Sequence, residues 1–171
     1  RIYSARFVGD TGYLVTFKQV DPFFVLDLSD PHQPRLAGEL KIPGFSSYLH
    51  PLTATLVLGV GQEEFKTKLS LFDVSNPSQP TEKSKLLLER GWTEVQSNHH
   101  AFLQDEKHEV VFLPAGDTGE IISYDQDTLT SKKSVSDIQA RRALYINDFL
   151  YIISQEKMFV VNEETWEQVS E

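Results

Sequence analysis

The motif LDLSDPHQP at residues 26–34 returns as FDVSNPSQP at residues 72–80. In both copies an apolar segment leads into Asp-x-Ser-Asp/Asn-Pro, a combination that is typical of a turn. A segment of mixed charged and apolar residues follows each copy. Asp27 and Asp73 are 46 residues apart, which is a spacing typical of a repeat architecture.

The turn residue marks the same place in four successive units. It falls where the third expected strand of each unit ends, at Asp27, Asp73, Asp125 and Asn162. The spacings of 46, 52 and 37 residues fit units in which loops vary and strands do not. Each unit offers four segments rich in Val, Ile, Leu, Phe and Tyr. Four strands in about 40–50 residues are typical of a β-propeller blade.

We therefore predict an all-β fold: one β-propeller domain over residues 1–171, built of four-stranded antiparallel blades. About four blades are expected, at residues 1–42, 43–89, 90–136 and 137–171. A propeller closes by pairing strands from the two ends of the chain, because an open edge strand invites association. The first unit starts at an inner strand and the last stops within its outer strand. We expect an arc of a larger ring, while a four-bladed ring and loops missing from the chain stay open as alternatives.

Two local expectations bear on the candidate site. Residues 98–103 are predicted as the opening strand of the third unit, and residues 43–47 as a linker before the second unit. No segment has a sustained helical period, so no helix is expected.

Composition excludes several classes of function. The chain has 25 acidic and 16 basic residues and a formal charge of -9, which argues against nucleic acid and an anionic membrane surface as partners. No apolar run approaches the roughly 20 residues of a membrane-spanning helix, so we expect no membrane insertion in this segment. Cysteine is absent, which excludes disulfides and thiolate sites. The chain begins at Arg1 rather than at methionine, which leaves room for an upstream targeting segment.

Several longer stretches are distinctive: DPFFVLDLSDP (21–31), GELKIPGFSSYLHPL (38–52), KLSLFDVSNP (68–77), NHHAFL (98–103) and ARRALYI (140–146). Together they resemble the family of secreted bacterial and archaeal proteins with a C-terminal β-propeller domain distantly related to WD40 repeats. The resemblance covers nearly the whole chain. It implies a propeller longer than this chain, a preceding segment and an extracellular or cell-surface location. It brings no catalytic residues with it.

The repeated turn has two interpretations. Its oxygens could suggest a calcium loop, but Ca²⁺ takes six to eight oxygen ligands and Asp27, Ser29 and Asp30 offer too few. We predict a structural role, in which Asp or Asn accepts backbone N–H groups and Pro fixes the backbone.

Cationic or titratable side chains recur where each unit begins, at Arg6, at His50, at His99 with His100, and at Arg142 beside Arg141. In a propeller these connections cross one face near the central channel. In an acidic protein their recurrence predicts a polar, weakly cationic site for an anionic ligand, a sugar or a peptide carboxylate. The alternative is that each group hydrogen-bonds a neighbouring blade.

Aromatic residues of the same connections, Phe45, Tyr48 and Trp92, could stack on sugars or pack between blades. The predicted ligand-binding residues are Arg6, Ser46, Ser47, Tyr48, His50, Trp92, Asn98, His99, His100 and Arg142.

Metal binding and catalysis find little support in the sequence. Adjacent histidines on a strand point to opposite faces, so at most one of His99 and His100 could join His50 in a metal site, with no carboxylate nearby. Ser46 or Ser47 with His50 would make a nucleophile and base, but no Gly-x-Ser-x-Gly motif surrounds them. We predict no metal, no cofactor and no catalytic residue.

The sequence favours a non-enzymatic, extracytoplasmic binding or scaffolding propeller that contacts a protein or glycan at its blade-connecting face. The alternative is a propeller hydrolase or lyase acting on extracellular polysaccharide or peptide. Such an enzyme should gather two carboxylates, or a carboxylate and a histidine, around the channel mouth.

Overall fold

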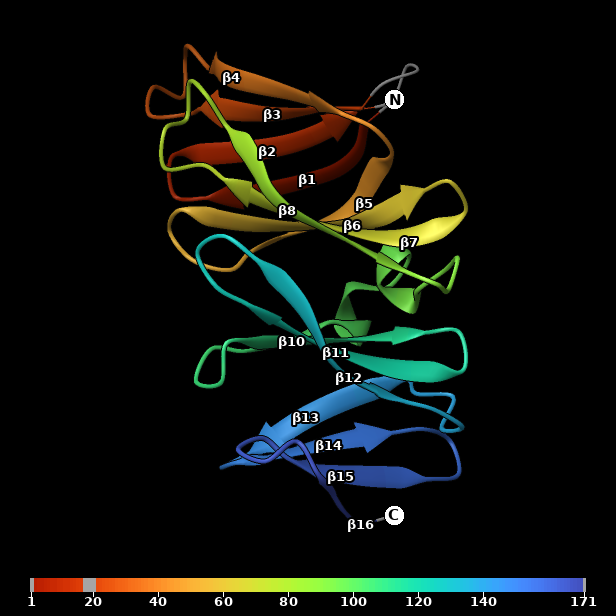
Figure 1. The fold of residues 1–171 in the computed structure, drawn as a ribbon. Coiled ribbons are helices and arrows are strands. Elements are labelled where there is room, and N and C mark those ends of the chain that lie inside the picture. The colour runs from red at the N-terminus through yellow and green to blue at the C-terminus, as the bar shows by residue number, and fades with distance from the viewer. Residues whose placement is uncertain (1, 17–20, 171) are drawn as a thin grey trace. The chain divides into compact units, whose positions relative to one another are not determined.

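The computed structural model describes residues 2–16 and 21–170, and the described chain is built of four antiparallel sheets of four strands each (Figure 1). In every sheet the strands pair in sequence order. The first sheet contains β1 (Ile2–Val8), β2 (Thr11–Thr16), β3 (Asp21–Asp27) and β4 (Arg35–Ile42). The second contains β5 (Phe45–Pro51), β6 (Leu56–Glu63), β7 (Lys66–Asp73) and β8 (Thr81–Leu88).

The third sheet contains β9 (Leu103–Asp105), β10 (Val110–Ala115), β11 (Thr118–Tyr124) and β12 (Leu129–Val135). The fourth contains β13 (Arg142–Ile146), β14 (Phe149–Ile153), β15 (Met158–Asn162) and β16 (Gln168–Ser170). Two single-turn 3₁₀ helices precede β9, η1 (Glu94–Gln96) and η2 (His99–Ala101). The prediction of four-stranded antiparallel units is confirmed. The chain divides into two compact units, Arg1–Leu88 and Glu89–Glu171, of two sheets each.

The repeated turn has the structural role predicted for it. β3, β7 and β15 end at Asp27, Asp73 and Asn162, and Asp125 directly follows β11. In each case the side-chain Oδ1 accepts the backbone N–H of the residue two positions later, at 2.8–3.0 Å. Hydrogen bonds within the turn are the main cause that lowers the pKa of the three aspartates. The motif therefore ends each third strand through a local contact.

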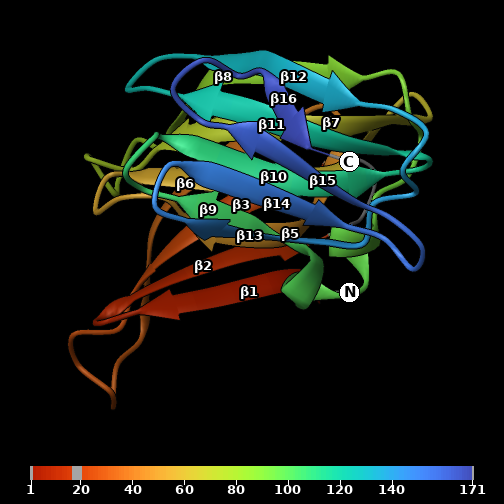
Figure 2. The same ribbon diagram turned by 90° about the horizontal axis from the view of Figure 1, so that it is seen from below.

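Each unit has its own apolar core between two sheets. In the first unit Phe23 of β3 stacks on Phe72 of β7 with 4.4 Å between ring centroids, and both rings are almost fully buried. In the second unit Phe112 and Ile121 of the third sheet belong to one cluster with Ile152 of the fourth. The two sheets of this unit lie face to face (Figures 1 and 2).

The turn of the second sheet also packs against the first sheet. A Cβ atom at Gly38 of β4 would lie 2.3 Å from the carbonyl oxygen of Pro77 and 2.9 Å from the Pro80 ring. Because a backbone atom and a ring surround the position, the contact has no flexible side chain that can yield. Glycine at this position therefore lets the repeated motif of one sheet dock on its neighbour.

We expect Gly38→Ala to lower the free energy of unfolding by about 1–3 kcal/mol, the range for overpacking. Gly12→Ala is the matched control, because its Cβ would meet only side-chain atoms of Phe7 and Leu28, at 3.2–3.3 Å. Urea unfolding followed by circular dichroism measures both. Equal stability of the two variants would contradict close docking at Gly38.

Two local predictions were wrong. Residues 98–103 do not form one strand: Asn98 caps η2 by accepting the His100 N–H at 3.2 Å, and β9 starts only at Leu103. Residues 43–47 are not all linker, since β5 begins at Phe45 and pairs with β6. Glycine makes this pairing possible, because a Cβ at Gly61 would lie 1.7 Å from the Phe45 carbonyl oxygen. The described residues include no helix long and apolar enough to span a bilayer.

Candidate functional site

In the first unit the predicted site residues bind one another. The Arg6 Nε donates to the carbonyl oxygen of Leu49 at 2.7 Å, and its guanidinium lies 4.9 Å from the centroid of the Tyr48 ring. The hydroxyl of Tyr48 is 3.1 Å from His50 Nδ1. Tyr48 is buried, and burial is the main cause that raises its pKa. These contacts join β1 of the first sheet to β5 of the second, which is the alternative in which such groups bind a neighbouring blade rather than a ligand.

The two serines of β5 also face the protein. Ser46 is buried, and its Oγ lies where a Cβ at Gly59 would come within 2.5 Å. Ser47 Oγ donates to the carbonyl oxygen of Val60 at 3.5 Å. Neither serine hydroxyl is therefore placed as a nucleophile that His50 could activate. The imidazole of His50 contacts the hydroxyl of Tyr48 instead.

In the second unit Asn98 and Arg142 meet at a residue that sequence reasoning missed. Glu94 Oε1 accepts a hydrogen bond from Asn98 Nδ2 at 3.0 Å and from Arg142 Nη1 at 3.0 Å. Glu94 is held in place because it begins η1, whose N-cap Thr93 accepts the Val95 N–H at 3.3 Å. The sequence T-E-V-Q at residues 93–96 fits a capping box, which is the signal that could have indicated this turn.

The two adjacent histidines lie outside this arrangement. Because His99 and His100 are in η2 rather than in a strand, their rings do not point to opposite faces. The ring centroids are 4.0 Å apart, and both residues are exposed. They do not line the cavity described next.

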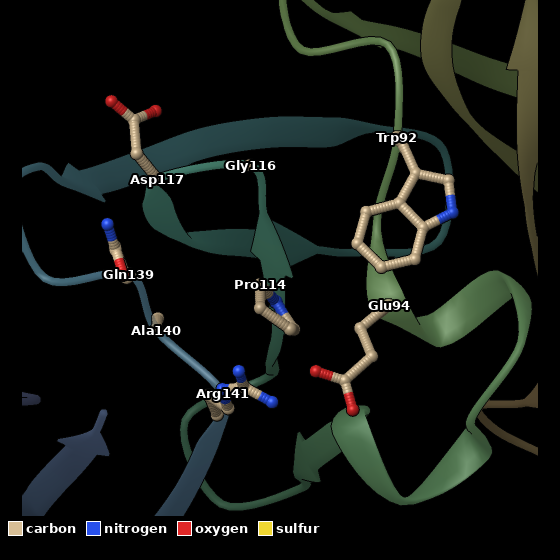
Figure 3. Close-up of a pocket in the computed structure, with 8 residues that line it drawn as sticks. All are labelled: Trp92, Glu94, Pro114, Gly116, Asp117, Gln139, Ala140 and Arg141. Atoms are coloured by element: carbon tan, nitrogen blue, oxygen red, sulfur yellow. The ribbon is translucent and has the colours of Figure 1, made fainter. Parts of the chain in front are cut away.

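A cavity of about 350 Å³ opens beside Glu94 (Figure 3). Trp92 and Glu94 line one side, and the β10–β11 turn around Gly116 and residues 139–141 of the connection to β13 line the rest. Of the predicted site residues, Trp92 is the one in this lining. A second cavity of about 420 Å³ shares Asp117, Gln139 and Arg141 and extends to the β14–β15 turn. Both lie on the side of the second unit where its connecting segments run.

The lining combines an open aromatic surface with paired charges. Trp92 is 51% exposed. The carboxylate of Glu94 is paired with Arg142, and that of Asp117 lies 2.9 Å from the guanidinium of Arg90. The lining also offers the amide of Gln139 and the guanidinium of Arg141. The site is therefore polar, with its acidic charge balanced by neighbouring arginines.

The backbone of this connection is strained. Asp137 and Gln139 have φ angles of 58° and 49°, a region that side chains other than glycine rarely adopt. The N–H of Gln139 donates to the carbonyl oxygen of Asp117 at 3.2 Å, which ties the connection to the β10–β11 turn. Such strain is often found at functional sites. It is a second reason to regard this pocket as the candidate site.

Two curated archaeal relatives match the chain over nearly its whole length. An uncharacterised protein of Archaeoglobus fulgidus is 56% identical over 171 residues, which are 100% of this chain and 27% of that protein. The uncharacterised protein MJ1554 of Methanocaldococcus jannaschii is 40% identical, over 99% of this chain and 28% of its own length. The chain thus spans about a quarter of the length of these relatives.

Solved structures resemble the fold at low sequence identity. Apo AztD from Citrobacter koseri aligns with a TM-score of 0.64 and 14% identity, over 99% of this chain and 45% of its own. Kluyveromyces lactis Hsv2 aligns with a TM-score of 0.53 and 12% identity, over 94% of this chain and 45% of its own. These likenesses concern the fold alone.

The family described as Beta propeller domain matches residues 1–166. Together with the four antiparallel sheets, this match confirms the predicted fold class. The chain belongs to the β-propeller domain family.

Proposed function

We propose that this chain is a non-enzymatic binding module of an extracytoplasmic propeller protein, and that the pocket beside Trp92 recognises a glycan. The observation that carries the proposal is the pocket lining, in which an exposed indole stands beside a carboxylate, an amide and a guanidinium. The proposed location follows from the resemblance of the sequence to secreted proteins, and it would bring the pocket within reach of cell-surface glycans.

A sugar matches this lining chemically. A pyranose ring has a face of C–H groups and a rim of hydroxyls, and an indole offers a flat apolar surface for the former. Glu94, Gln139 and Arg141 provide acceptors and donors for the hydroxyls. A volume of about 350 Å³ is within the range of small-molecule sites. Arg142 balances the charge of Glu94 and Arg90 that of Asp117, so the guanidinium of Arg141 adds a positive charge to the lining.

The carboxylates favour binding over hydrolysis. Glycoside hydrolases use two carboxyl groups that flank the bond they cleave. Here Glu94 and Asp117 are each committed to an ion pair with an arginine. In Figure 3 the carboxylate of Asp117 is directed away from that of Glu94. This arrangement supports a binding site rather than an acid–base pair.

We expect Trp92→Ala to weaken glycan binding at least tenfold, about 1.4 kcal/mol, because it removes the stacking surface without disturbing the core. The probes are soluble oligosaccharides of glucose, mannose, galactose and N-acetylglucosamine, and binding is measured by isothermal titration calorimetry. Tyr145→Ala is the matched control, since Tyr145 is an exposed aromatic residue of the same unit outside the pocket.

Three results bear on the proposal. Binding that Trp92→Ala weakens and Tyr145→Ala leaves unchanged supports it. Absence of binding to every probe, or equal binding by both variants, contradicts it. Release of new reducing ends from a bound probe would replace it with the hydrolase alternative.

A further inference from the structure

A second polar cluster of the second unit lies at the ends of its strands opposite to the pocket. Asp105 ends β9, His108 is in the turn to β10, and Glu163 directly follows β15. One ligand atom from each residue lies within 4.8 Å of the other two. Asp105 and Glu163 are each 2% exposed, and the side chain of His108 is 12% exposed. Three groups that bind metals in other proteins thus meet in a nearly closed site.

Glu163 is the unusual member of this cluster. Within the described part of the chain, neither of its carboxylate oxygens accepts a hydrogen bond, although both are buried. His108 Nδ1 lies 3.7 Å from its Oε2. A buried carboxylate without hydrogen bonds is costly, and a bound cation would remove that cost.

We propose that Asp105, His108 and Glu163 bind a divalent transition-metal ion of the zinc or manganese class. One imidazole nitrogen with two carboxylates is a donor set for such ions. Calcium and magnesium prefer oxygen ligands alone, so the histidine argues against them. The cluster is separate from the glycan pocket, and this inference does not depend on the proposed function.

The spacing of the ligand atoms suits an ion between them. Tetrahedral bonds of about 2.0–2.1 Å separate neighbouring ligand atoms by roughly 3.3 Å. His108 Nδ1 lies 2.7 Å from Asp105 Oδ2 and 3.7 Å from Glu163 Oε2. These two distances lie on either side of the required separation, and all three ligand atoms lie within 4.8 Å of one another. Water would complete the coordination of the ion.

Asp148 is placed to orient the histidine. Its Oδ1 lies 3.3 Å from His108 Nε2, on the other side of the ring from the cluster. If the ring donates its Nε2–H to Asp148, the lone pair of Nδ1 is directed at the ion, as in other carboxylate–histidine–metal arrangements. Lys107 is paired with Asp148, which balances its charge. Asp148 is therefore a positioning residue rather than a ligand.

The test uses protein treated with EDTA and dialysed, to which Zn²⁺, Mn²⁺, Ca²⁺ or Mg²⁺ is added. We expect Zn²⁺ to bind in calorimetry with one ion at this site and to raise the melting temperature, with Mn²⁺ weaker and Ca²⁺ and Mg²⁺ without effect. Glu163→Gln should weaken Zn²⁺ binding at least about 100-fold, because it removes an anionic ligand and keeps the shape. Asp148→Asn should cost about 10-fold, as outer-shell changes do.

The surface histidines provide the control. His99→Gln/His100→Gln removes the adjacent exposed imidazoles of the same unit, and it should leave the high-affinity Zn²⁺ site intact. If Glu163→Gln does not fold, His108→Gln tests the same ligand set. The proposal is overturned if no Zn²⁺ binds, if binding survives both ligand substitutions, or if it is lost in the surface double variant. In the first case Asp105 and Glu163 form a structural pair without a metal.

Discussion

Lys68→Ala is expected to lower the free energy of unfolding by about 3–5 kcal/mol, the range for a buried ion pair that loses one partner. The side chain of Lys68 in β7 is 1% exposed. Its Nζ donates to the carbonyl oxygen of Pro43 and lies 3.4 Å from Glu63 Oε2 and 3.6 Å from Glu82 Oε1. Without Lys68, two partly buried carboxylates and a carbonyl group lose their shared cation.

Two further variants separate charge from volume. Methionine fills nearly the same space as lysine but carries no charge. If the charge of Lys68 is what stabilises the cluster, Lys68→Met should therefore lose almost as much stability as Lys68→Ala. Adding Glu82→Gln to Lys68→Met should recover part of the loss, because one uncompensated carboxylate becomes neutral. Urea unfolding by circular dichroism measures the stabilities, and hydrogen exchange of β5–β8 locates the change. A Lys68→Met variant as stable as the wild type would show that the ion cluster contributes nothing.

An exposed ion pair is the control for the buried cluster. Lys41 is 64% exposed and lies 3.3 Å from Glu39, so Lys41→Ala should change the free energy of unfolding by less than about 1 kcal/mol.

The dependence of stability on acid pH is an independent test of the ion cluster. The hydrogen bond from Lys85 is the main cause that lowers the pKa of Glu63 from 4.5. The resulting stabilisation is present above pH 4.5 and is lost as the pH falls through the lowered pKa.

The fold could be predicted because its signals are local. Asp27 and Asp73 end their strands through hydrogen bonds to the residue two positions later, so the turn can be recognised from a short stretch of sequence. The same locality explains the error at residues 98–103. There the Asn98 side chain bonds the His100 N–H, and this short-range contact prevails over the strand tendency of the apolar residues that follow.

The candidate site could be predicted only in part. Trp92 and Asn98 lie in a connecting segment and Arg142 begins β13, which are places where a site was expected. Glu94, which binds Asn98 and Arg142, was not predicted. Nothing near Glu94 in the sequence indicates that Arg142 will lie 3.0 Å away. Likewise, only the packing of the third sheet against the fourth brings Glu163 to Asp105 and His108. Of the charged residues expected at the start of each unit, Arg141 lines the pocket, Arg142 contacts Glu94 of its lining, and the others lie outside the lining.

Phe72→Ala is expected to have an effect as large as Lys68→Ala, about 3–5 kcal/mol. Phe72 is fully buried, and its ring stacks on Phe23 across the two sheets of the first unit. A Cβ at Gly59 would lie 2.8 Å from the Phe72 ring, so the ring lies directly on the β6 backbone. No side chain at Gly59 can move into the space that the ring leaves. The cavity left by alanine therefore collapses poorly, and the cost stays near the upper part of the range.

The control is an aromatic residue of the same unit that lies outside the apolar core. Phe65, in the β6–β7 turn, is 94% exposed, so Phe65→Ala should change stability by no more than about 0.5 kcal/mol. Phe72→Leu should cost less than Phe72→Ala, since it restores most of the lost volume. Urea unfolding followed by circular dichroism ranks the three variants. If Phe72→Ala loses no more stability than Phe65→Ala, the stacked pair is not what joins the two sheets, and the other apolar residues that the two sheets bury together must do so instead.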